Sequence, residues 1–403
     1  MGTLSGIRIV DLSAIISGPL AATILADQGA EVIKVEPIQG EQLRHMSRST
    51  KATPPTFFSC NRGKKSLPLN LKSNTGKAIL RDLVATADVL IQNFRPGAME
   101  RMGLSYDALS ALNPRLIYVS ISGFGEAGPY ASKRVYDPVI QALSGATDIQ
   151  ADRESGRPQM FRLVVADKVT SLTAAQAVAA ALFERERSGV GQHIRISMLD
   201  AMLAFLWPSG MPGLTYADEE DVRQVLGSRD LVFETQDGFI TAGAVSDSEW
   251  RGMCRALDRE ELLDDPRFNN TAGRAANADL RRGIMAEALK HWSSKEILER
   301  LDENDVPCAP IVDRAKLLAN EQLVVSGAIE VASYPGFGEV RQARPPALFE
   351  RTPSAIQGPG PRIGDQAYDV LRSLGYDDNR ISALATAGET VLARDNPSDE
   401  IKR

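Results

Sequence analysis

The sequence predicts an α/β protein whose first part is a parallel sheet built from βαβ units and whose second part is a smaller α+β domain. Strand-like runs alternate with helical runs of about 10–15 residues in the first third of the chain, as βαβ units require. The strand-like runs are almost continuously apolar, as in strands buried on both faces. The chain has 403 residues, and a single core rarely exceeds about 250–300 residues, so we expect two domains.

The elements of the first part follow one another with short connections. Strands are expected at residues 7–13, 31–36, 87–94 and 114–125, and helices at residues 20–30 and 75–87. A longer helix is expected from Lys168 to Arg187, with one apolar face made of Leu172, Ala175, Val178, Ala179 and Leu182. It ends at the turn 188–191 and is followed by a strand at 193–199 and a helix at 201–206.

A Pro/Gly-rich segment from Pro208 to Tyr216 marks the end of the first part. Residues 231–245 then predict a β-hairpin with Asp237-Gly238 as its turn. Helices are expected at 249–257, 279–292, 295–303 and 368–374. The predicted domains are a large domain at 1–207, a linker at 208–225, a small α+β domain at 226–325, and a segment at 326–403 that includes a strap and returns to the large domain. The strap would cross either the chain's own surface or a partner subunit.

Composition excludes several classes of partner. The net charge is −6, and no Lys/Arg block or aromatic-basic stripe indicates nucleic-acid binding. Arg62, Lys64 and Lys65 form a locally basic spot that could bind a small anion. The three cysteines and three histidines are scattered, so we expect no disulfide framework, no metal site and a reducing compartment. No signal-peptide pattern or membrane-length apolar run appears, which predicts a cytoplasmic protein that does not bind membranes.

Asp167 follows the apolar run Leu-Val-Val-Ala and precedes the long helix. One interpretation is a helix N-cap, because Asp is a preferred residue there. Another is a nucleophile, because a carboxylate at a helix N-terminus is kept ionised by the dipole and can attack an acyl carbonyl. Position alone does not separate the two interpretations.

Two loops after predicted strands are candidate ligand sites. The turn from Ser13 to Pro19 precedes a helix, where phosphates bind, and Glu36 stands where a dinucleotide-binding fold keeps its ribose-binding acid. The Gly-x-Gly-x-x-Gly fingerprint is absent, and Gly18-Pro19 could be a simple tight turn. In the second loop, Phe94 could stack on adenine and Arg101 could bind a phosphate, or they could be a core ring and a solvated cation.

Taken together, these motifs resemble family III CoA-transferases, the group of formyl-CoA, carnitine and succinyl-CoA:glutarate CoA-transferases, and the related 2-methylacyl-CoA racemases. The matching segments occur in family order over nearly the whole chain. They are LSGIRIVDLS with SGP, GAEVIKVEP, NRGKKS, ADVLIQNFRPGAMERMGL, NPRLIYVSISGFGEAGPY, YDPVIQALSG, the Asp167 segment running to SGVGQHIRISMLD, and VPCAPI.

The resemblance implies a Rossmann-like large domain, an interlocked homodimer, and coenzyme A and a carboxylic acid as substrates with no permanently bound cofactor. It assigns Asp167 as the catalytic nucleophile and succinyl-CoA as a possible donor. It also implies CoA contacts, with two of them near the thioester, at Ile15, Leu69, Lys72, Asn93, Phe94, Arg101, Met102, Arg134 and Tyr136.

The sequence departs from the family pattern in two places. Ala14 and Ile16 replace the His and Gln of formyl-CoA transferase, which disfavours oxalate-type substrates and indicates a more apolar acyl pocket. Tyr136 stands where the racemases have a His before the Asp. With an unperturbed pKa near ~10, Tyr is a poor second proton carrier, so transfer is favoured over racemisation, which stays the alternative.

Overall fold

The computed structural model describes residues 2–46, 53–152, 155–217 and 231–393. The chain forms two compact units, one made of Met1–Gly227 with Gly327–Arg403 and the other of Ser228–Ser326. Within the described part, no helix combines the length and the apolar character needed to cross a membrane. The domain limits given by the sequence stay predictions.

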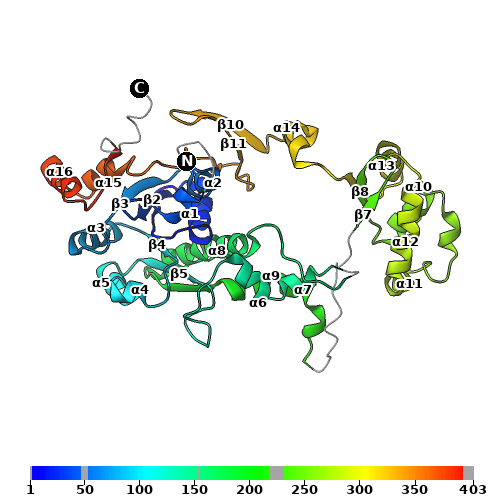
Figure 1. Cartoon of the computed structure of the whole chain (residues 1–403), viewed down its shortest axis with the longest axis horizontal. Coiled ribbons are helices and arrows are strands. Elements are labelled where there is room, and N and C mark those ends of the chain that lie inside the picture. The colour runs from blue at the N-terminus through cyan, green and yellow to red at the C-terminus, as the bar shows by residue number, and fades with distance from the viewer. Residues whose placement is uncertain (1, 47–52, 153–154, 218–230, 394–403) are drawn as a thin grey trace. The chain divides into compact units, whose positions relative to one another are not determined.

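The larger unit is built on a six-stranded parallel sheet with the order β3-β2-β1-β4-β5-β6 (Figure 1). The strands are β1 (Arg8–Asp11), β2 (Glu31–Glu36), β3 (Lys65–Pro68), β4 (Val89–Gln92), β5 (Ile117–Ser122) and β6 (His193–Ser197). The strand order reverses between β1 and β4, and ligands of open α/β sheets bind outside the carboxyl ends of the strands at such a point. The predicted α/β class with a parallel sheet is confirmed.

Helices cover both faces of this sheet and bury two separate apolar cores. One face carries α1 (Ser17–Asp27), α6 (Asp137–Leu143), α7 (Ala146–Ile149), α8 (Val165–Ser188) and α9 (Met198–Gly210). The other carries α3 (Asn74–Val84), α4 (Ala98–Arg101), α5 (Tyr106–Leu112), α15 (Ala367–Ser373) and α16 (Asp378–Thr386). The large unit therefore has three layers.

The prediction of β2 matches its observed bounds, whereas α1 and α8 each begin three residues before their predicted starts. The predicted apolar face of α8 is wrong in part, because Leu172 is 62% exposed and Ala179 is also exposed. Ala174 and Ala181 are buried instead, and α8 packs closely against α1. Small side chains on this face allow the two helices to approach each other.

The strap begins with a hairpin that the sequence did not predict, formed by β10 (Ile329–Tyr334) and β11 (Gly338–Ala343). Phe58 of α2 (Pro55–Asn61) packs against the rings of Tyr334 and Phe337 in this hairpin. Further along, the N–H of Ala355 donates to the carbonyl of Asp27 at 2.9 Å. In this single chain the strap therefore crosses the surface of its own large unit.

The smaller unit has a three-stranded antiparallel sheet of β7 (Val232–Glu234), β8 (Phe239–Ala242) and β9 (Cys308–Pro310). The hairpin predicted around Asp237-Gly238 is confirmed. The helices of this unit are α10 (Asp247–Ala256), α11 (Thr271–Ala276), α12 (Ala278–Leu289), α13 (Ser294–Glu303) and α14 (Glu321–Val325). Apolar side chains of the sheet and of α10, α12 and α13 form a core of their own around Trp250 and Phe268.

Candidate active site

A cavity of about 400 Å³ lies beside the carboxyl ends of β1, β4 and β5. Its walls come from the turn before α1, the loop after β4, the end of β5, the segment that leads into α6, and the start of α8. Its lining includes Ala14, Ile15, Ser17, Asn93, Phe94, Arg134, Tyr136, Asp137 and Asp167. The cavity therefore occupies the position where this class of sheet binds ligands.

Asp167 is the third residue of α8 and is only 8% exposed. The interpretation of Asp167 as the N-cap is wrong, because the helix begins at Val165 and its N-cap is Val164. The carboxylate that accepts a backbone N–H in this first turn is that of Asp137, whose Oδ2 lies 3.1 Å from the backbone nitrogen of Asp167. The Asp167 side chain is thus left to face the cavity.

The electrostatic surroundings of Asp167 are unusual for a carboxylate. Burial, with the charge of Asp137 adding to it, raises the pKa of Asp167 to about 6. The backbone N–H and the hydroxyl of Ser17, the first residue of α1, donate to the carboxylate and oppose the rise. The sequence predicted a carboxylate stabilised by the helix dipole; burial outweighs that effect, although the group is still mostly ionised at neutral pH.

Asp137 is a residue that the sequence analysis passed over. It begins α6, is 3% exposed, and accepts a hydrogen bond from Gln141. The available signal was the Asp-Pro pair, which is typical of a helix start. Nothing in the local pattern shows that this carboxylate lies against Asp167, because the two residues are thirty positions apart.

The structure rules out two alternatives that the sequence had left open. Glu36 is not free to bind a ribose, because Arg44 holds its carboxylate with two contacts of 2.7 Å and Ser66 donates to it at 2.8 Å. Lys64 is not an anion-binding residue, because it is buried and donates to Asp11 at 2.7 Å. Its neighbour Arg62 is paired with a carboxylate of α1 at 2.7 Å.

The structure brings part of the predicted CoA site together. Ile15, Asn93, Phe94, Arg134 and Tyr136 line the cavity with Asp167. The Asn93 side chain is already occupied, because it accepts the N–H of Ala14 at 2.9 Å and donates to its carbonyl at 2.8 Å. Phe94 and Tyr136 expose 37% and 61% of their surfaces.

The remaining four predicted residues do not line this cavity. The Leu69 side chain is buried in a core cluster, and Met102 packs against the same cluster. Lys72 is exposed at the surface. Arg101 is exposed and folds back over Gly97, in the loop after β4. Coenzyme A contacts at all four positions stay predictions.

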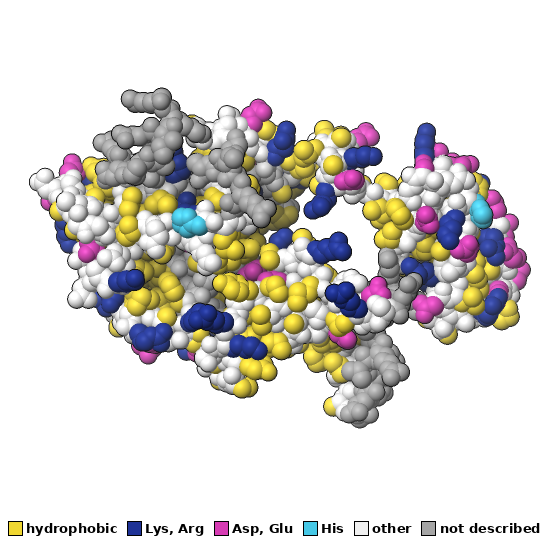
Figure 2. All heavy atoms as spheres, viewed as in Figure 1, with side chains coloured by type: hydrophobic (Ala, Val, Ile, Leu, Met, Phe, Trp, Pro, Cys, Tyr) yellow, Lys and Arg dark blue, Asp and Glu magenta, His cyan; other side chains and the backbone are white. Residues whose placement is uncertain are grey.

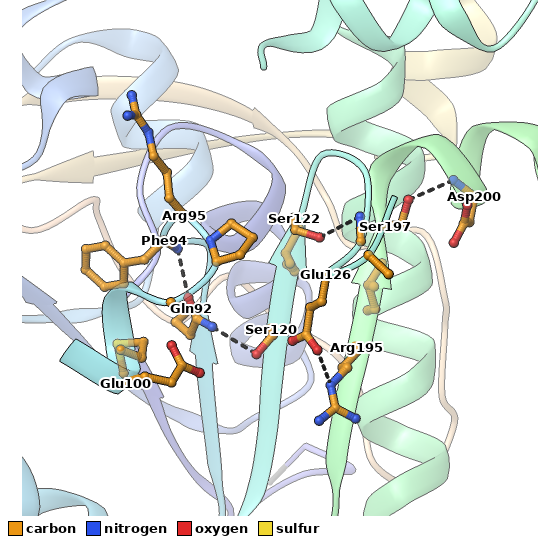
Figure 3. Close-up of a pocket in the computed structure, with 17 residues that line it drawn as sticks. Gln92, Phe94, Arg95, Glu100, Ser120, Ser122, Glu126, Arg195, Ser197 and Asp200 are labelled. Atoms are coloured by element: carbon orange, nitrogen blue, oxygen red, sulfur yellow. Dashed lines mark hydrogen bonds and ion pairs between the residues drawn. The ribbon is translucent and has the colours of Figure 1, made fainter. Parts of the chain in front are cut away.

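A second cavity of about 200 Å³ shares the loop after β4 with the first (Figure 3). Gln92 accepts the N–H of Phe94 at 2.8 Å and donates to Ser120 at 2.9 Å, which fixes the start of this loop. Glu126 and Arg195 form an ion pair of 2.8 Å on the opposite wall. The loop after β4 therefore lines both cavities, and the hydrogen bonds of Gln92 fix its start.

Comparison with known proteins identifies the class. A family model described as CoA-transferase family III matches residues 4–367. The chain is 34% identical to succinate–glutarate CoA-transferase of Agrobacterium fabrum, covering 92% of this chain and 95% of that protein. It is 30% identical to formyl-CoA:oxalate CoA-transferase of Streptomyces coelicolor, covering 96% and 98%. The crystal structure of a CaiB/BaiF family protein from Brucella suis superposes with a TM-score of 0.79 at 30% identity, covering 93% and 99%.

The chain therefore belongs to CoA-transferase family III. It is an enzyme that transfers coenzyme A between an acyl-CoA and a carboxylic acid, as its resemblance to this family predicted.

Proposed function

We propose that Asp167 is the nucleophile of a ping-pong CoA transfer that passes through an aspartyl anhydride and an aspartyl thioester. The observation that carries the proposal is a buried carboxylate that lines the cavity, with a pKa raised to about 6 and two donors from Ser17. A carboxylate of this kind is ionised at neutral pH yet poorly solvated, and both properties favour attack on an acyl carbon.

The steps balance without an outside acid, base or oxidant. An Asp167 oxygen bonds to the thioester carbon, the C–S bond breaks, and the CoA thiolate leaves with the electron pair. The thiolate then attacks the Asp167 carbonyl of the anhydride and releases the donor acid as a carboxylate. The acceptor carboxylate repeats these two steps in reverse order on the aspartyl thioester. The product is a new acyl-CoA, and Asp167 returns to a carboxylate.

The donor and acceptor follow from the relatives and from the turn before α1. Relatives named for succinate and glutarate support succinyl-CoA as a donor and a dicarboxylic acid as an acceptor. Ala14 lines the cavity and offers no polar side chain, which supports the prediction of an apolar acyl pocket. Ile16 does not line it and packs instead against Leu43 and Phe57.

The quaternary structure and the compartment extend this proposal. An interlocked homodimer is supported by apolar side chains left exposed on α8 and α9, of which Phe183 is 68% and Phe205 56% exposed. Figure 2 shows apolar side chains on the face that carries these helices. Light scattering after gel filtration checks the dimer. A cytoplasmic location is supported by three cysteines that are free in the structure.

Mass spectrometry of the Asp167 peptide tests the covalent route. Incubation with succinyl-CoA alone should leave coenzyme A on this peptide, and hydroxylamine should remove it. Asp167→Asn should give no adduct, whereas Asp88→Asn should retain it, because Asp88 lies at the amino end of β4, away from the carboxyl ends of the strands. An enzyme that transfers CoA at the normal rate without Asp167 would contradict the proposal.

Racemisation is the alternative reaction. Deuterium entry at Cα of a 2-methylacyl-CoA, without an acceptor acid, measures it directly. We expect none, since Tyr136 replaces the histidine of the racemase pattern.

A further inference from the structure

The turn that connects β1 to α1 contains a strained residue. Ile15 has a φ of 68°, which is an outlier for a β-branched side chain. Such a conformation persists only where the surroundings hold it, and it is commonest at functional sites. Glu41 stabilises this conformation, because its Oε2 accepts the Ile15 N–H at 3.0 Å and the Leu43 N–H at 3.2 Å.

Polar side chains from β1, from β2, from the loop after β4 and from the segment before β3 hold other parts of the turn. Asp11 accepts the N–H of Ser13, and Lys34 donates to the carbonyl of Ser13 at 3.0 Å. The Asn93 amide occupies both backbone groups of Ala14, and Lys64 donates to the carbonyl of Pro19 at 2.7 Å. Gly18 also approaches Ser13 so closely that a Cβ at position 18 would lie 2.3 Å from the Ser13 hydroxyl. Side chains from outside the turn thus hold several of its backbone groups.

The end of the turn faces the reactive carboxylate. Ser17 lines the cavity with Asp167 and donates both its N–H and its hydroxyl to that carboxylate. Its carbonyl accepts the hydroxyl of Ser171 at 2.8 Å, one turn further along α8. Because Ser17 lies two residues after Ile15, the backbone conformation at Ile15 sets where these donors point.

Glu41 differs from its neighbour Glu36 in how its carboxylate is used. The Glu36 carboxylate is held by the side chains of Arg44 and Ser66 and also accepts the N–H of Glu41. One carboxylate oxygen of Glu41 accepts two backbone N–H groups. The other oxygen is buried 3.6 Å from the Lys34 ammonium and has no hydrogen bond in the described part of the chain. Lys34 compensates the charge, and the charge strengthens the hydrogen bond to Ile15.

We propose that Glu41 is a positioning residue for CoA transfer: it holds Ile15 in the left-handed conformation and thereby fixes the donors of Ser17 against Asp167. The inference rests on the proposed role of Asp167 as the nucleophile. Glu41 acts through the backbone and does not line the cavity.

A double-mutant cycle tests the inference. Glu41→Ala should lower kcat about 10- to 100-fold, because small displacements of reacting groups cost that much, while KM for the acyl-CoA changes less than about threefold. In an Ile15→Gly background the penalty of Glu41→Ala should shrink to about threefold or less, since glycine adopts a positive φ without help. Glu41→Gln keeps an acceptor for the Ile15 N–H and should recover most of the kcat. The loss that remains should disappear in the Ile15→Gly background, and this comparison carries the test if Glu41→Ala does not fold.

Asp88→Asn is the matched control. Asp88 also accepts a backbone N–H, that of Arg8, and pairs with buried Arg185 at 2.8 Å. This variant should lower the melting temperature and leave kcat unchanged. Equal penalties of Glu41→Ala in both Ile15 backgrounds, or a loss that appears only in KM, would overturn the inference.

The outcomes separate this inference from the proposed function. Absence of any Asp167 adduct in the parent enzyme refutes the covalent route itself. Normal adduct formation in the parent, with an unchanged rate in Glu41→Ala and Glu41→Gln, refutes only the role of Glu41.

Discussion

Two groups of buried carboxylates lie near the carboxyl ends of the strands, and they differ in what surrounds them. Asp11 lies 2.7 Å from Lys64 and 3.9 Å from Lys34; although burial alone would raise its pKa, these two cations hold it below its usual value. Asp167 has another carboxylate, Asp137, as its neighbour, and neither forms an ion pair with a described Lys or Arg. Its pKa rises.

Burial does not by itself make a carboxylate reactive. Paired with cations, a buried carboxylate stabilises the fold and keeps its charge at any ordinary pH. When a buried carboxylate lies beside a second carboxylate, its negative charge is poorly compensated. Neutralising that charge with a proton or an acyl group then lowers the free energy of the site.

Asp167→Asn should have the largest effect on activity. We expect kcat to fall by at least about 10³-fold, because the amide cannot form the anhydride. Steady-state assays with succinyl-CoA and glutarate measure the loss. A decrease of less than about tenfold would place the nucleophile elsewhere.

Lys64→Met should have the largest effect on stability. Removing this cation leaves Asp11 buried and incompletely compensated, so the free energy of unfolding should fall by about 3 kcal/mol. Denaturant unfolding of the whole chain measures it. Lys65→Met is the control, since its pair with Glu31 is partly exposed and should contribute less than about 1 kcal/mol.

Asp167→Asn should stabilise the protein while it abolishes activity. The folded protein binds the Asp167 proton more tightly than the unfolded chain does, so this group's contribution to stability is lost as the pH rises from about 4 through 6. Removing the charge should therefore raise the free energy of unfolding by about 1–3 kcal/mol at pH 7.5. Below pH 4 the difference should vanish. A gain of the same size at both pH values would contradict this origin.

Asp137→Asn should have the smallest effect, a shift in the pH profile. The acidic limb of kcat should lie near pH 6 in the parent enzyme, because Asp167 must be ionised to attack. Without the charge of Asp137 the limb should move down by roughly one pH unit, while burial keeps it above the usual range for Asp. An unchanged limb would show that burial alone sets this pKa.

The sequence predicted the parts of the fold that depend on local patterns. The strand pattern at 31–36 became β2 with the predicted bounds, and Asp237-Gly238 became the hairpin turn. The prediction failed where contacts between residues far apart in the sequence determine the structure. The start of α1 follows a left-handed residue held by Glu41, and the hairpin β10–β11 packs on α2, far away in the sequence.

For the site, the sequence by itself identified the family, whose model matches residues 4–367, and predicted Asp167 as the nucleophile. Only the tertiary structure decided which polar groups are free. In the sequence, Lys64 and Glu36 looked available to bind a ligand. In the folded chain both form hydrogen bonds shorter than 3 Å with other side chains. Asp137 looked like a helix start and became the second carboxylate. Charge compensation is a property of spatial neighbours, and so the raised pKa of Asp167 comes from contacts that no local pattern records.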